Sequence, residues 1–132
     1  MTSFEFSNLD NAQFKGLAKK CNLIAIPLIL LSLYHLSHAV FPLLYMEATR
    51  VLPSYFIIMS VVDIFSLVAA YFFVCASRSY VAIVKTQGAD IALLIIGNDQ
   101  LRLAINCLCI TLFLYSARFA LAGIPLKGVI QN

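Results

Sequence analysis

The sequence is poor in charged residues and has no tryptophan. Only 11% of its 132 residues are charged, whereas soluble globular domains have about 25%. An ordinary soluble domain is therefore excluded. The net charge of +3 comes from scattered lysines and arginines, which excludes nucleic acid as a partner. Hydrophobic residues make up 62% of the chain, and a chain of this length forms one domain, so we expect residues 1–132 to be a single membrane domain.

Motifs of catalysis and metal binding are also missing. The chain has no nucleophile elbow, no HExxH, no phosphate-binding glycine loop and no paired carboxylates of the DxD kind. Its four cysteines form no CxxC pair, which argues against a zinc site or a disulfide framework. No motif is specific to a family. We therefore expect a chain that is not an enzyme and holds no cofactor and no metal.

Three apolar runs are each long enough to cross a bilayer as a helix, which takes about 20 residues. We place these spans at residues 22–46, 54–76 and 103–124. The expected fold is an all-α integral membrane protein with three transmembrane helices. Residues 125–132 are expected to form an outward tail.

Residues 1–20 precede the first span and are expected to form an amphipathic cytoplasmic helix. Ser7 and Asp10 have the spacing of a capping box, which predicts a helix that begins near Asn8. A basic region precedes the first apolar run, as in a signal peptide, but this run is too long for the apolar core of one, so we interpret it as an uncleaved span.

The stretch 77–102 decides how many times the chain crosses the membrane. A span here would bury Lys85 and Asp90, and a charge at the bilayer centre costs at least about 2.5–3.5 kcal/mol. We expect a protruding cytoplasmic helical hairpin instead, whose turn contains Gln87 and Gly88 and whose second helix is capped by Asp90. An elbow lying flat on the membrane is the alternative. The helices of the hairpin are expected to pack through apolar residues at helical spacing, namely Val81, Val84, Ile91, Leu94 and Ile95.

The basic residues set the predicted orientation. Six lie on one side of the predicted spans and two on the other, a positive-inside pattern that places the amino terminus in the cytoplasm and the carboxyl terminus outside. We expect the bacterial inner membrane. The six are Lys15, Lys19, Lys20, Arg78, Lys85 and Arg102, and the two are Arg50 and Lys127.

Four ionisable residues lie inside the predicted spans, and such residues are functional candidates. They are His35, His38, Asp63 and Arg118. Counting about 1.5 Å per residue places Asp63, His38 and Arg118 within about 5 Å of the same height. We therefore expect an intramembrane polar cluster in which Asp63 pairs with Arg118 and His38 lies close to both.

Small and polar residues form stripes where spanning helices are expected to touch. One stripe, on the second span, contains Ser60, Asp63, Ser66 and Ala70, and another, on the third, includes Thr111 and Tyr115. The simplest interpretation of the cluster is a contact that fixes the register of these helices. A proton path or a contact with another subunit is the alternative. Haem or metal at His35 and His38 would need ligands from a second chain.

These patterns favour a non-catalytic integral membrane subunit in contact with lipid. It would assemble with copies of itself, or act as an accessory or structural component of a larger membrane complex. The alternative is an oligomeric channel or a proton- or ion-conducting unit that uses Asp63, His38 and Arg118.

Overall fold

The computed structural model describes part of the chain. It covers the backbone of residues 8–45, 54–85 and 90–122, and within them the side chains of residues 10–38, 60–85 and 91–117. The predicted turn at Gln87 and Gly88 lies outside the described residues, as does the predicted outward tail.

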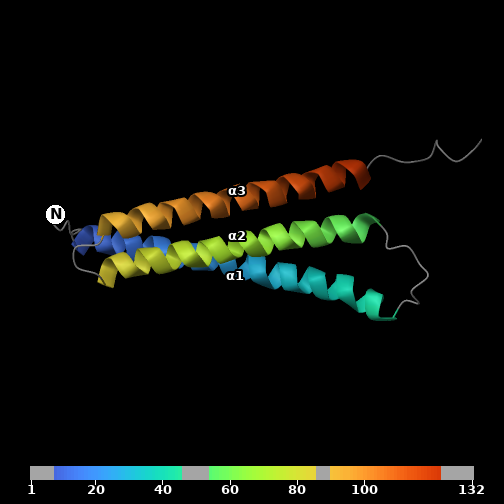
Figure 1. Cartoon of the computed structure of the whole chain (residues 1–132), viewed down its shortest axis with the longest axis horizontal. Helices are drawn as coiled ribbons and strands as arrows, with labels where there is room; N and C mark the ends of the chain where they lie inside the picture. The colour runs from blue at the N-terminus through green and yellow to red at the C-terminus, as the bar shows by residue number, and fades with distance from the viewer. Residues whose placement is uncertain (1–7, 46–53, 86–89, 123–132) are drawn as a thin grey trace, which may run out of the picture.

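The described chain is all-helical (Figure 1). Helix α1 is Asn8–Tyr45, α2 is Ser54–Lys85 and α3 is Asp90–Ala122. Successive helices run in opposite directions (Figure 1). Helix α2 packs against both α1 and α3, whereas the backbones of α1 and α3 do not approach each other as closely over the described residues. The bundle is therefore organised around α2.

Each helix is long and apolar enough to cross a membrane. The helices have 38, 32 and 33 residues, which corresponds to about 57, 48 and 50 Å, and the hydrocarbon core of a bilayer is about 30 Å thick. The expected all-α class and the presence of three such helices are confirmed. The crossing itself, and the water-facing hairpin at 77–102, stay predictions.

The helix boundaries agree with the local signals in the sequence at three points. Helix α1 begins at Asn8, α2 ends at Lys85 and α3 begins at Asp90. No break separates residues 8–20 from the predicted first span, because α1 runs from Asn8 to Tyr45. These residues and the predicted span thus form one continuous helix.

Buried residues recur every seven positions on all three helices, which is the repeat of a left-handed coiled coil. Most of them are small, and small residues let helix backbones approach closely. On α1 they are Ala18, Ala25 and Ser32; on α2, Val62, Ala69, Ala76 and Ile83, together with Ser66, Phe73 and Tyr80; on α3, Gly97, Ala104 and Thr111.

The core lies mainly toward the end of the bundle where α1 and α3 begin. Of the five apolar residues expected to pack here, Val81 and Leu94 pack against the core, whereas Val84, Ile91 and Ile95 are exposed. Tyr80 and Gly97 make a closer contact that was not expected: a β-carbon on Gly97 would lie 3.0 Å from the Tyr80 ring. Only glycine leaves room for an aromatic ring at this distance, so the two helices meet through one large and one minimal side chain.

Candidate functional site

A polar layer joins all three helices in the half of the bundle away from the core. It consists of His35 on α1, Asp63 on α2 and Tyr115 on α3, and we call it the His35 layer. The register of the bundle explains why these residues meet. Tyr80 on α2 bonds to Asn98 on α3. Asp63 precedes Tyr80 by the same number of residues by which Tyr115 follows Asn98. Because α2 and α3 are antiparallel, the same register brings Tyr115 level with Asp63.

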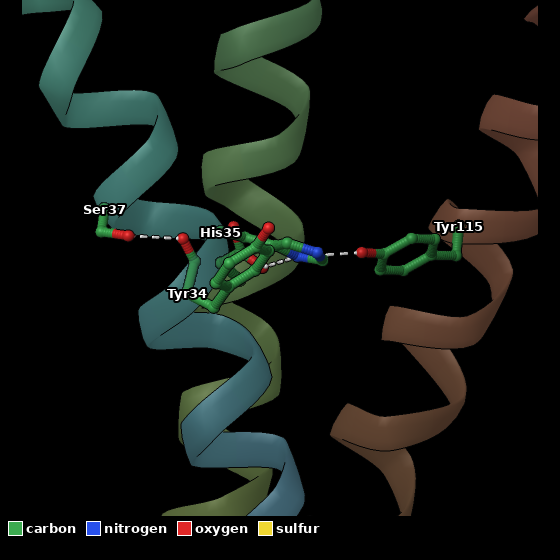
Figure 2. Close-up of polar contacts among 5 residues, drawn as sticks. Tyr34, His35, Ser37 and Tyr115 are labelled. Carbon is green, nitrogen blue, oxygen red and sulfur yellow. Dashed lines mark hydrogen bonds and ion pairs between the residues drawn. The ribbon is translucent and has the colours of Figure 1, made fainter.

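One nitrogen atom holds the His35 layer together. His35 Nδ1 lies 3.3 Å from Asp63 Oδ1 and 3.0 Å from the Tyr115 hydroxyl. Figure 2 shows Tyr115 reaching from α3 toward the His35 ring on α1. A ring nitrogen has either one hydrogen or one lone pair. It therefore cannot donate fully to Asp63 and accept from Tyr115 at the same time.

The carboxylate of Asp63 is almost completely enclosed. Its side chain is 3% exposed, against 26% for that of His35. Within the described part of the chain, Asp63 Oδ2 and the Ser32 hydroxyl are buried without a hydrogen-bond partner. Ser32 lies about one helical turn from His35 on α1. Buried polar atoms are nearly always bonded in proteins, so the unpartnered oxygen of Asp63 marks a position where a water molecule or a proton can reside.

The other predicted cluster residues are placed differently. His38 is exposed, and its ring lies edge-on to Tyr34 with centroids 4.5 Å apart. Arg118 belongs to α3, but its side chain lies outside the described residues, and so does its predicted pairing with Asp63. The partner that the structure gives Asp63 is His35. Counting heights along the helices had favoured His38 over His35 as the histidine close to Asp63.

The predicted contact stripes lie along the helix interfaces. Ser66, Ala70 and Thr111 are buried, whereas Ser60 and Tyr115 are half-buried. The Thr111 hydroxyl donates to the carbonyl of Cys107 in its own helix at 2.9 Å, so it needs no partner on α2. Of the predicted hairpin residues, Lys85 is exposed at the end of α2.

A second polar layer, which the sequence argument missed, lies near the other end of the bundle. The Tyr80 hydroxyl donates to Asn98 Oδ1 at 2.8 Å, and the Ser79 hydroxyl donates to Gln100 Oε1 at 2.9 Å. The Phe14 ring on α1 stacks on Tyr80 with centroids 6.2 Å apart. We call Ser79, Tyr80, Asn98 and Gln100 the Tyr80 layer. Its signal in the sequence was the seven-residue series that ends at Tyr80.

The described side chains include no group of three or more histidine, cysteine or acidic residues suited to a metal ion. The four cysteines are free. Haem or metal shared between chains at His35 and His38 stays an untested alternative. What the His35 layer can do chemically is exchange protons, since it brings together a carboxyl, an imidazole and a phenol.

The chain matches no family model, no curated protein and no solved structure. The outer surface of the bundle and the His35 layer are therefore the basis for a functional proposal.

Proposed function

We propose that the chain is an integral membrane protein whose three helices all cross the bilayer. The support is the outer surface, where large apolar side chains are exposed on every helix. Leaving such a side chain in water forgoes about 1.5–3 kcal/mol, and extended apolar surfaces of this kind mark contacts with lipid or protein. Among them are Leu23, Ile26, Leu30 and Leu33 on α1, Ile64 and Tyr71 on α2, and Ile95, Leu112 and Phe113 on α3.

The proposed orientation has the amino terminus in the cytoplasm of a bacterium and the carboxyl terminus outside its inner membrane. Its support is the position of the basic residues. Helix α1 begins, α2 ends and α3 begins at the same end of the bundle (Figure 1), and the exposed side chains there include Lys15, Lys20, Arg78, Lys85 and Arg102. Reporter fusions to the two termini test this arrangement.

Within the membrane we propose that the chain is a non-catalytic subunit that assembles with copies of itself or with a larger complex. One observation carries this proposal: His38 faces out of the bundle from within the predicted first span. An imidazole facing lipid is costly, and polar side chains inside membranes commonly bond to a neighbouring helix. A helix of another subunit would supply the partner for His38.

Native mass spectrometry after gentle extraction from the membrane tests assembly. We expect either an integer multiple of the 14.6 kDa chain or a complex with larger proteins. His38→Leu should shift the population toward the single chain, whereas Ser37→Ala should not, because the Ser37 hydroxyl already donates to the carbonyl of Tyr34. Finding only the single chain in mild detergents and in lipid nanodiscs would contradict the proposal.

The second candidate is an oligomeric unit that conducts protons or ions. The observation that favours it is the Asp63 carboxylate, which is buried and has one oxygen without a partner among the described residues. Asp63→Asn separates the two candidates. A conducting site should keep assembly and lose flux into liposomes, whereas a purely structural pair should lose assembly or stability.

A further inference from the structure

We propose that the His35 layer is a binding site for a single proton, and that the bound proton decides whether His35 Nδ1 donates a hydrogen bond to Asp63 or accepts one from Tyr115. This inference rests on the proposed membrane insertion but not on conduction, since a site can bind a proton without passing it on. The argument starts from the two oxygen atoms that share His35 Nδ1.

In the empty state Asp63 is ionised and Nδ1 carries the hydrogen of a neutral ring. Nδ1–H then donates to Asp63 Oδ1, which needs this donor because ionised carboxylates only accept hydrogen bonds. The Tyr115 hydroxyl then finds no lone pair at Nδ1 and cannot donate to it, although its oxygen can still accept a hydrogen bond. The layer holds one negative charge.

In the loaded state the carboxyl of Asp63 is protonated. The hydrogen of the neutral His35 ring then sits on Nε2, and Nδ1 accepts from the Tyr115 hydroxyl. Nδ1 lies 3.0 Å from the Tyr115 hydroxyl and 3.3 Å from Asp63 Oδ1, so either oxygen is within reach as the proton is bound or released. Two neutral groups also suit an enclosed site better than an ion pair, whose desolvation is costly. The two states differ by one proton.

The surroundings leave the site without a competing charge among the described side chains. On α1 the neighbouring titratable residues are Tyr34 and His38, both exposed. On α2 the residue is Asp63 itself, flanked by buried Val62 and Ser66. On α3 it is Tyr115, and Arg118 follows about one turn further along, with its side chain outside the described residues. The orphan oxygen Asp63 Oδ2 is the free position at which a proton can reside.

The structural consequence concerns α1 and α3. Within the described residues their backbones do not pack directly against each other, and the hydrogen bond between Tyr115 and His35 joins the two helices through side chains. Proton binding at Asp63 would change the direction of this hydrogen bond and hence its strength.

Carbodiimide labelling tests the proposal on the full chain in its membranes. Dicyclohexylcarbodiimide is an apolar reagent that reacts with protonated carboxyls. We expect it to label Asp63 at low pH and to lose this labelling as the pH rises, with Asp63→Asn unlabelled throughout. The exposed carboxyl of Asp99 serves as an internal comparison for a water-soluble carbodiimide.

Two variants should move the midpoint of labelling in opposite directions. Tyr115→Phe removes the donor that stabilises the loaded state, so labelling should end at lower pH. His35→Leu removes the donor that stabilises the ionised carboxylate, so labelling should persist to higher pH. Tyr71→Phe, which alters an exposed residue on α2 outside the layer, should leave the midpoint unchanged.

Absence of labelling at every pH, or equal midpoints in wild type, Tyr115→Phe and His35→Leu, would overturn the proton site. Circular dichroism of each variant shows whether it has folded, and the wild-type pH dependence is decisive without any variant. Failure of membrane insertion gives a different result. Alkaline carbonate would then release the chain from membranes, and the water-soluble carbodiimide would label Asp63 as readily as Asp99.

Discussion

The Tyr80 layer and the His35 layer lie in the same bundle and differ in how their hydrogen bonds are shared. In the Tyr80 layer each hydroxyl donates to a different side-chain amide oxygen across α2 and α3, and Ser79 Oγ also lies 3.3 Å from the Cys75 carbonyl oxygen of its own helix. In the His35 layer two oxygens compete for one nitrogen, and a carboxylate oxygen has no partner among the described residues. A fully bonded layer fixes one structure, whereas an incompletely bonded layer can change its protonation state.

The packing around the two layers differs in the same sense. Tyr80 is completely buried, with Phe14 stacked on its ring and Gly97 against its edge. His35 is a quarter exposed and Tyr115 is half-buried. We infer that the Tyr80 layer holds the three helices together and that the His35 layer is left free to respond to its surroundings.

Removal of the Tyr80 ring should have the largest effect on stability. Emptying a buried aromatic site costs about 3–5 kcal/mol, and Tyr80→Ala also removes the hydrogen bond to Asn98. The midpoint of unfolding by dodecyl sulfate, followed by circular dichroism, should fall accordingly. Tyr71→Ala is the control, because Tyr71 lies on the same helix and is 64% exposed. Equal losses in both variants would break the distinction between a structural layer and the surface.

Alanine substitutions at two glycines test the same distinction, and we expect them to change the stability of the protein in opposite directions. A β-carbon at Gly97 would lie 3.0 Å from the Tyr80 ring and 3.3 Å from Ser79 Cβ, whereas one at Gly16 meets nothing within 4 Å. Alanine stabilises a helix by about 1 kcal/mol relative to glycine, and overpacking costs about 1–3 kcal/mol. Gly16→Ala should therefore stabilise the protein, and Gly97→Ala should destabilise it by about 1 kcal/mol. The same unfolding assay decides, and a gain in both variants would show that α2 and α3 are not in close contact at Gly97.

The sequence predicted the helix ends better than the partners of the polar residues. Helix capping is a local property of the sequence, and the predicted helix starts near Asn8 and at Asp90 are confirmed. The height of a residue along a helix was also estimated by counting, but height leaves the rotation about the helix axis open. The structure fixes that rotation. It turns His35 toward Asp63 and leaves His38 exposed.

The sequence contains a signal for this rotation, namely small residues that recur every seven positions. Ala18, Ala25 and Ser32 define the inner face of α1, and His35 lies one turn beyond Ser32 on that face. The Tyr80 layer was not predicted for a related reason. Residues 77–102 are predicted to form a water-facing hairpin that packs through apolar residues, and this prediction does not include a tyrosine bonded to an amide.

Replacement of the whole Asp63 and His35 pair should have the smallest effect on stability. Apolar residues often substitute for a buried ionisable pair with no loss, because the desolvation cost of the pair disappears with it. His35→Leu alone strands Asp63 without its donor and should cost about 1–3 kcal/mol. The double variant with Asp63→Leu should return to within about 1 kcal/mol of wild type, since no carboxyl is then left buried without its donor. Unfolding by dodecyl sulfate measures this cycle. A double variant as unstable as Tyr80→Ala would mean that the two layers serve the same structural purpose, and near-equality with wild type would mean that Asp63 and His35 are present for the proton they hold.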